Sequence, residues 1–165
     1  EQSAEKWITL QDEIDTLNIY ITLEANRFED KFDYSILDNE NLNVKKILIP
    51  PMLLQPYIEN AIKHGIIPKN GKGKIEISFT IKENTLICSL RDNGIGRKKS
   101  LEIKSGHERK SFGMDITKQR MDLLSKIFSD ERYGVKIHDL YDRQGVAEGT
   151  LVEIFIPVNY IEQEK

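Results

Sequence analysis

The sequence has little of what would indicate a secreted or membrane-spanning protein. It contains one cysteine, one tryptophan and five prolines among its 165 residues. The single cysteine, Cys88, excludes an intramolecular disulfide, and its position within the apolar run 86–90 predicts a buried, unreactive thiol. No apolar run approaches the roughly 18 residues that a membrane-spanning helix needs, and no export signal is present. We therefore expect these residues neither to cross a membrane nor to be exported.

An excess of positive charge is also missing. Lysine and arginine total 24 against 27 aspartates and glutamates, which gives a net charge of -3 and a sequence pI near 5.7. Nucleic acids and anionic membranes attract dominantly basic surfaces, so we expect no nucleic-acid binding. The length and the 39% of hydrophobic residues predict one domain with a hydrophobic core. Because the chain begins at Glu1 instead of methionine, we expect it to be part of a longer protein.

Alternating apolar and polar residues predict the strands. Such runs occupy residues 31–37, 74–82, 85–91, 134–141 and 150–157. Only Glu83 and Asn84 separate the second run from the third. A gap of this length is typical of a hairpin, so these two strands are expected to be antiparallel.

Two helices are predicted from apolar residues that recur three, four and seven positions apart. The first runs from a capping box at Thr9 to about Arg27, and the second from about Gly113 to Phe128. The second helix is expected to bury Ile116, Met121, Leu124 and Ile127. The order of helices and strands predicts an α+β fold, a two-layer sandwich whose mixed, mostly antiparallel sheet is covered on one face by helices.

Residues 51–65 predict a further, amphipathic helix with two unlike faces. Pro51 is expected to start this helix, Pro56 to bend it and Gly65 to end it. Its apolar face consists of Leu54, Ile58, Ala61 and Ile62, and its polar face of Glu59, Asn60, Lys63 and His64. An acid, an amide, an ammonium and an imidazole side by side are typical of a site for a polar ligand, such as a phosphorylated molecule with a metal ion.

Of the residues on this polar face, Asn60 is the one whose presence helix formation alone does not explain. Asparagine is a poor helix former, whereas Glu59 and Lys63 taken singly also suit a solvated helix surface. Magnesium usually takes one or two protein oxygens together with substrate phosphates. The amide of Asn60, flanked by Glu59, is therefore a sufficient anchor for Mg²⁺.

Two further segments are candidates for ligand contact. Asp92-Asn93-Gly94-Ile95-Gly96 follows a predicted strand, where glycines let the backbone approach a ligand and Asp92 can accept a hydrogen bond from an exocyclic amine. A plain strand-ending turn is the alternative. Residues 94–112 hold six basic and two acidic residues and are expected to form a long loop, either a phosphate-binding lid or a solvated loop. Ser111-Phe112-Gly113 then leads into a helix whose first amides favour an anion.

In this order the motifs resemble the ATP-binding domain of the gyrase, chaperone, histidine kinase and mismatch-repair ATPase superfamily. Residues 54–65 are similar to the N box of LytS/YehU-type bacterial sensor histidine kinases, residues 92–96 to their first glycine box, and Gly149-Thr150 to their closing motif. The resemblance implies a Bergerat-type ATP-binding fold. It also implies that residues 1–28 lead in from a dimerisation and phosphoacceptor region, and that residues 29–165 form the ATP-binding domain.

The resemblance implies a site for ATP and Mg²⁺. Asn60 would bind the metal ion, Glu59 would be the catalytic residue, and Asp92 would receive the adenine amino group. Residues 97–112 would form the lid over the nucleotide. The implied ATP contacts are Asn60, Lys63, His64, Gly65, Asp92, Gly94, Gly96, Ser111, Gly113, Arg120 and Thr150.

Two features depart from the family pattern. The second glycine box usually reads Gly-x-Gly, but here it reads Ser111-Phe112-Gly113, so only Gly113 and the downstream Arg120 carry over. The phosphoacceptor segment Pro-His-Phe-Leu-Phe-Asn is absent: His64 lies in the N box, His107 in the predicted lid, and His138 in a strand, where it is expected to be structural.

The resemblance implies transfer of the ATP γ-phosphate to a histidine upstream of these residues and then to a response regulator. The domain would be cytoplasmic, and other parts of the protein would hold it at the cell membrane. A nucleotide-binding regulatory module without kinase activity and a related conformational ATPase are the alternatives.

Overall fold

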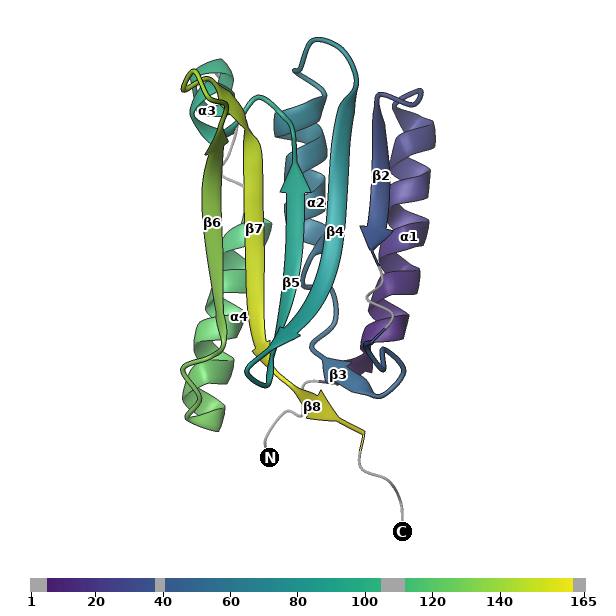
Figure 1. Cartoon of the computed structure of the whole chain (residues 1–165), viewed down its shortest axis with the longest axis vertical. Helices are drawn as coiled ribbons and strands as arrows, with labels where there is room; N and C mark the ends of the chain where they lie inside the picture. The colour runs from purple at the N-terminus through teal and green to yellow at the C-terminus, as the bar shows by residue number, and fades with distance from the viewer. Residues whose placement is uncertain (1–5, 38–40, 105–111, 162–165) are drawn as a thin grey trace.

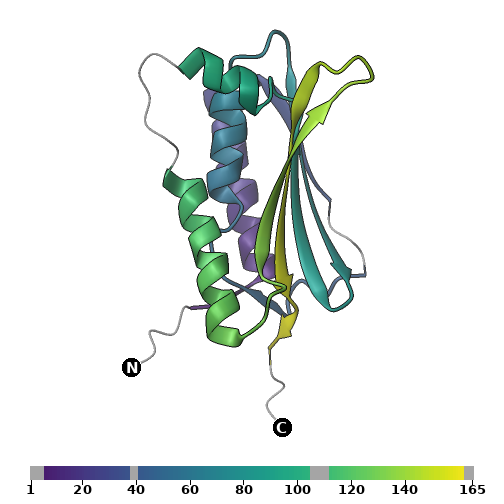
Figure 2. The same cartoon turned by 90° about the vertical axis from the view of Figure 1, so that its left-hand side faces the viewer.

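Five strands form the main sheet, and the helices lie on one of its faces (Figures 1 and 2). The structure is a computed structural model that describes residues 6–37, 41–104 and 112–161, without the side chains of residues 104 and 112–115. Among the described helices, none is both long enough and apolar enough to cross a bilayer.

The strands of the main sheet are, in spatial order, β2 (Phe32–Leu37), β4 (Gly73–Lys82), β5 (Thr85–Asp92), β7 (Ala147–Pro157) and β6 (Gly134–Tyr141). β2 pairs with β4 in parallel, and all other neighbours in this sheet pair antiparallel. A small second sheet contains β1 (Ile8–Thr9), β3 (Ile47–Ile49) and β8 (Asn159–Tyr160). The predicted α+β fold, with a mostly antiparallel sheet covered on one face, is confirmed.

The helical elements are α1 (Leu10–Arg27), α2 (Gln55–Asn60), the π-helical segment η1 (Ala61–Ile66), α3 (Arg97–Lys104) and α4 (Phe112–Phe128). The capping box predicted for the first helix is confirmed. The Thr9 hydroxyl accepts the amide hydrogen of Asp12 at 3.1 Å, and the Asp12 carboxylate accepts that of Thr9 at 3.4 Å.

The β4–β5 hairpin also forms as predicted. Glu83 and Asn84, the two residues between its strands, have φ angles of 49° and 59°. Positive φ at both turn positions matches the right-handed twist of the flanking strands, which is why two-residue hairpin turns favour residues such as asparagine.

The hydrophobic core fills the space between the helices and the sheet. Cys88 in β5 is 1% exposed, which confirms the predicted buried thiol, and burial raises its pKa above the usual value. Fully buried side chains come from every layer, among them Leu10, Leu17, Ile21, Ile58, Ile62, Ile75, Ile77, Phe79, Met121 and Ile154.

The helix predicted over residues 51–65 begins later and continues further than expected. Met52 has a φ of 58°, a left-handed conformation that interrupts any helix, so α2 begins at Gln55 and not at Pro51. Pro56 therefore lies in the first turn of α2, where its missing amide hydrogen costs no hydrogen bond, and not further inside the helix as predicted. Gly65 does not end the helix either, because it lies inside η1.

Two predictions about the second half of the chain are also wrong. In α4, Ile116 and Ile127 are 54% and 57% exposed, because among the described side chains of this helix, residues 116–128, the buried ones form the narrow stripe of Thr117, Met121 and Leu124. Residues 97–104, expected as part of a long loop, form helix α3, which contacts η1 and β7.

Candidate functional site

Asp92, the last residue of β5, is a buried carboxylate that accepts hydrogen bonds from two groups of the protein itself. It is 3% exposed, its Oδ1 accepts the amide hydrogen of Gly94 at 2.8 Å, and its Oδ2 accepts the Thr150 hydroxyl hydrogen. Burial raises the pKa of Asp92, and the hydrogen bonds from Thr150 and Gly94 oppose this effect without cancelling it. A carboxylate offers about four acceptor positions, so these two donors leave capacity for a ligand amine.

Three backbone segments meet around Asp92, and glycines let them do so. A Cβ atom on Gly94 would lie 2.5 Å from the Cα of Gly65, and one on Gly149 would lie 2.0 Å from the Asp92 carbonyl oxygen. The amide of Ile95 donates to the Gly65 carbonyl at 3.0 Å. Side chains at these glycines would separate η1, the turn after β5, and β7. Sequence reasoning placed Gly65 at a helix end and missed this contact.

The turn after β5 is held from its other side by lysines. The Lys69 ammonium donates to the Asn93 carbonyl at 2.7 Å, and the Lys74 amide donates to Asn93 Oδ1 at 2.6 Å. The charge of Lys69 also acts to lower the pKa of Asp92. Lys69 therefore helps to shape the site.

The predicted polar face lies on α2 and η1. Lys63 and Glu59 form an ion pair, with Nζ 2.5 Å from Oε1, and their side chains are 43% and 46% exposed. Asn60 and His64 are half-buried. Gly65 in η1 lies beside Asp92, because a Cβ atom added to it would be 3.2 Å from Asp92 Oδ1. Asn60, the last residue of α2, precedes Gly65 by five residues, which is between one and two helical turns. π-helical turns such as η1 are frequent at functional sites.

The side chains of this polar face suit a metal ion that is bound mainly by the phosphates of a small molecule and not by the protein. Among the described residues there is no group of three His, Cys, Asp or Glu side chains that could hold a metal ion. A protein-only metal centre is therefore not built from that part of the chain. The single half-buried amide of Asn60 beside Glu59 fits Mg²⁺, which accepts one protein oxygen and completes its shell with water and phosphates.

Helix α3 is anchored to the sheet at its first residue. Gly96, with a φ of 81°, turns the chain into α3, and Arg97 then forms a bidentate pair with Asp139 on β6. The Nε–Oδ1 and Nη2–Oδ2 distances are 2.7 and 2.8 Å. The pair raises the pKa of Arg97 and lowers that of Asp139. Of the residues predicted for the lid, 105–111 lie outside the described residues, and Ser111 with them. Gly113, predicted as an ATP contact, lies in the first turn of α4.

Arg120 and Glu13 meet at the segment before α2. Arg120 Nη1 donates to the Pro51 carbonyl at 2.8 Å. Glu13, which sequence reasoning missed, is 2% exposed and accepts the amides of Met52 and Leu53 at 3.0 and 3.1 Å. A signal was present, because Glu13 occupies a position in the otherwise apolar stripe of the first helix.

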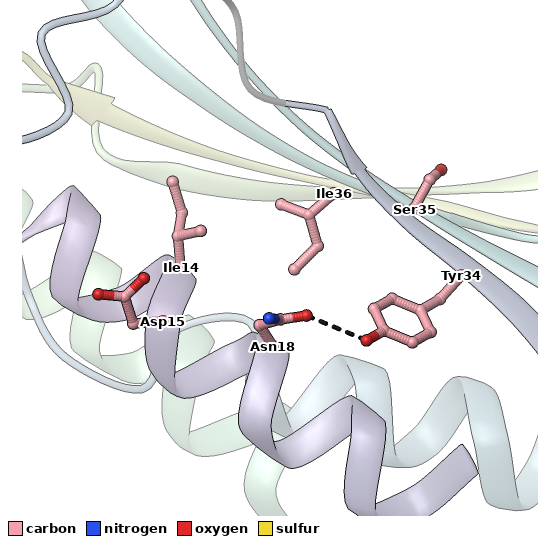
Figure 3. A pocket seen from close by; sticks show the side chains of 6 residues that line it. All are labelled: Ile14, Asp15, Asn18, Tyr34, Ser35 and Ile36. Carbon is pink, nitrogen blue, oxygen red and sulfur yellow. Dashed lines mark hydrogen bonds between the residues drawn. The ribbon is translucent and has the colours of Figure 1, made fainter.

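A groove of about 400 Å³ between α1 and β2 is separate from this site (Figure 3). It is lined by Ile14, Asp15, Asn18, Tyr34, Ser35 and Ile36. The Tyr34 hydroxyl donates to Asn18 Oδ1 at 3.0 Å across it. None of the predicted site residues lines this groove.

The fold is that of a histidine kinase catalytic domain. The structure is similar to the mycobacterial sensor histidine kinase MprB (TM-score 0.58, 12% identity, 96% of this chain and 100% of that one). It is also similar to the catalytic domain of histidine kinase ThkA (TM-score 0.55, 20% identity, 92% and 94% covered). A further solved structure shows ThkA in complex with the response regulator TrrA (TM-score 0.54, 19% identity, 93% and 42% covered).

Sequence similarity identifies the relatives more narrowly. The chain is 30% identical to the sensor histidine kinase YesM of Bacillus subtilis over 152 residues, 91% of this chain and 24% of that protein. It is 28% identical to the sensor protein LytS of Oceanobacillus iheyensis over 162 residues, 94% and 26%. It is 30% identical to the sensor histidine kinase BtsS of Escherichia coli over 132 residues, 80% and 21%.

The chain is thus homologous to sensor histidine kinases over most of its length, as the motifs predict. It spans about a quarter of the length of these relatives. No family model matches the chain. Histidine kinase catalytic domains use ATP, generally with Mg²⁺.

Proposed function

We propose that the chain is the ATP-binding catalytic domain of a sensor histidine kinase, which transfers the γ-phosphate of ATP to a histidine outside these residues. A response regulator then receives the phosphate. The observation that carries this proposal is Asp92, a buried carboxylate held by Thr150 and Gly94 and contacted by the glycine that follows the polar face of the N box. The hydrogen-bond acceptor for adenine therefore lies next to the helix that would face the phosphates.

Asp92 selects the base. Its carboxylate accepts a hydrogen bond from the adenine amino group, while Thr150 and Gly94 keep the acceptor oxygens in place. Because Asp92 is buried, this hydrogen bond contributes to the free energy of binding: a buried acceptor left without its donor costs about 1–3 kcal/mol. Guanine offers a carbonyl oxygen at the corresponding position, so Asp92 discriminates against it.

Glu59 and Lys63 exchange partners when the nucleotide binds. Their ion pair is about half-exposed and links positions i and i+4 of a helix, an arrangement that contributes only about 0.3–0.5 kcal/mol. Phosphate oxygens compete easily for the Lys63 ammonium. Once Lys63 and His64 contact the phosphates, the Glu59 carboxylate is free to orient the attacking histidine.

Asn60 would hold Mg²⁺ together with the nucleotide. Its amide oxygen would be the protein ligand, since Mg²⁺ usually takes one or two protein oxygens together with substrate phosphates. When bound, Mg²⁺ supplies charge neutralisation at the transferred phosphoryl group. Gly96 lets the chain turn from the base-binding strand into α3, the described part of the lid.

The remaining parts of the proposal concern the longer protein. Residues 1–28, which include α1, lead from the dimerisation and phosphoacceptor region into the domain formed by residues 29–165. The domain lies in the cytoplasm, and segments outside these residues hold the protein at the cell membrane.

Titration calorimetry with a non-hydrolysable ATP analogue, with and without Mg²⁺, tests nucleotide and metal binding. The wild-type chain should bind the analogue more tightly with Mg²⁺, and Asn60→Ala should remove that difference. Asn18→Ala, an exposed position on α1, serves as the matched control and should behave as the wild type. Absence of binding by the wild type would refute the proposed function, whereas an unchanged Mg²⁺ effect in Asn60→Ala would refute the metal assignment alone.

A second experiment separates a kinase from a nucleotide-binding regulatory module. The upstream phosphoacceptor segment of the full-length protein is added in trans together with ATP labelled at the γ-phosphate. Acid-labile label on the added histidine supports the kinase. Nucleotide binding without such label, in a chain that binds the analogue normally, supports the regulatory module.

A further inference from the structure

The carboxylate of Glu13 belongs to α1 but serves the start of α2. Met52 and Leu53 donate their amide hydrogens to its two oxygens at 3.0 and 3.1 Å. Glu13 is 2% exposed and Leu53 is 1% exposed, so the hydrogen bond between them is buried, while the one from Met52, a 54% exposed residue, is part-buried. One buried side chain therefore fixes the backbone immediately before the N-box helix.

The start of α2 depends on this external acceptor. Leu54, the residue at the N-cap position, cannot supply a side-chain hydrogen bond, and none caps the helix. Met52 adopts a left-handed φ of 58°, which an unbranched residue sustains only where surrounding contacts hold it. Without Glu13, the amides of residues 52 and 53 would lose their acceptor, and that of Leu53 would lose it at a buried position.

Arg120 holds the same segment from the opposite helix. It lies on α4, which packs against α2, and its Nη1 donates to the Pro51 carbonyl at 2.8 Å. The charges of Arg120 and Glu13 lie close enough to interact. The segment 51–53 is thus held between one residue of α1 and one of α4.

We propose that Glu13 and Arg120 are positioning residues for the N-box helix: they fix the segment before α2 and thereby set where Glu59 and Asn60 stand. This inference rests on the proposed function, because it gives α2 its role at the nucleotide. It gives Arg120, which the motifs predict as an ATP contact, a role at the backbone of Pro51. Both α1 and α4 then hold the segment 51–53, so that a shift of either helix would move α2 and with it Asn60.

Hydrogen exchange of the free chain tests the positioning without any nucleotide. Glu13→Gln keeps the size of the side chain but places an amide NH₂ where one of the two acceptor oxygens was. We expect amides of residues 52–60 to exchange at least tenfold faster in this variant, and amides of the β4–β5 hairpin to exchange at the wild-type rate. Asp15→Asn, the same loss of charge at an exposed position on α1, is the matched control and should change neither region.

Arg120→Met is the second variant, and it decides the question if Glu13→Gln does not fold. It removes the donor to Pro51 but keeps an apolar stem, and we expect the same local acceleration at residues 52–60. Arg120→Lys, which keeps the charge, should restore part of the protection. Unchanged exchange at residues 52–60, or a uniform acceleration that includes β4 and β5, would overturn the proposal, since the second pattern shows only a general loss of stability.

Nucleotide affinity links the local effect to the site. For variants that show the local exchange pattern, the dissociation constant for the Mg²⁺-bound ATP analogue should rise about tenfold. Wild-type affinity in such a variant would overturn the positioning role. A wild-type chain that binds no nucleotide is a different outcome: it refutes the proposed function, and with it the role assigned to α2, while the exchange data still show whether Glu13 and Arg120 hold the segment.

Discussion

Thr150 donates its hydroxyl hydrogen to Oδ2 of Asp92, and the two residues are direct partners in the β5–β7 ladder. The sheet itself therefore brings the donor to the acceptor. No loop has to close for this pair to form, so the sheet itself holds together the part of the site that we propose to recognise the base.

Thr150→Val should lower both the stability of the chain and its nucleotide affinity. Valine has the shape of threonine without the hydroxyl, so the buried Asp92 carboxylate loses a donor at a cost of about 1–3 kcal/mol in the free energy of unfolding. The pKa of Asp92, already raised by burial, should rise further. Urea unfolding measures the stability, and Thr150→Ser, which keeps the hydroxyl, should remain within about 1 kcal/mol of the wild type.

Gly94→Ala should destabilise the chain because the added methyl group has no space. It would lie 2.5 Å from the Cα and carbonyl carbon of Gly65, which are backbone atoms of the helical segment η1. Overpacking of this kind costs about 1–3 kcal/mol and should also displace η1 from Asp92. Thermal unfolding of Gly94→Ala is compared with that of Gly134→Ala, where an added Cβ meets nothing within 4 Å. Equal melting temperatures would contradict the close packing of Gly65 on Gly94.

Much of the fold could be predicted from the sequence because local patterns determine it. The alternation of Ile75, Ile77 and Phe79 with polar residues defines β4, and all three side chains are buried. The capping box at Thr9 likewise depends on residues within one turn of each other. Such short-range patterns specify an element without reference to its neighbours.

The predictions that failed depend on contacts between distant segments. The prediction extended the helix back to Pro51, whereas Met52 lies outside it with a φ of 58° and donates its amide hydrogen to Glu13, 39 positions earlier in the chain. Gly65 has the residue type of a helix end, but it serves the approach of Gly94. Ile116 continues an apolar pattern in α4, yet the packed stripe is narrower than that pattern. The site residues were found as motifs, and their mutual contacts required the structure.

The Arg97–Asp139 pair should affect the local stability of α3 more than the free energy of unfolding of the whole chain. The two side chains are 42% and 36% exposed, and solvent-exposed ion pairs contribute about 0–1 kcal/mol. A double-mutant cycle with Arg97→Ala and Asp139→Ala should therefore give a coupling energy below about 1 kcal/mol in urea unfolding. Amide exchange in α3 should accelerate equally in both single variants and no further in the double variant. Additive acceleration would show that the two residues act on α3 independently.

The pH dependence of stability should reveal the burial of Glu13. Burial raises its pKa above the usual 4.5, and the hydrogen bonds from Met52 and Leu53 only partly offset this. The folded chain therefore binds the Glu13 proton more tightly than the unfolded chain does. This contribution to stability is fully present below about pH 4.5 and is lost as the pH rises through the folded-state pKa.

Glu13→Gln removes this titration, while other groups such as Asp92 titrate equally in both chains. The stability of the wild type relative to Glu13→Gln should therefore decline as the pH rises from about 4.5 towards neutrality. Urea unfolding at several pH values measures the difference. Parallel profiles would mean that Glu13 has the same pKa in both states. A difference that grows with pH would mean that the amides of Met52 and Leu53 outweigh burial, because a lowered pKa reverses the sign of the linkage.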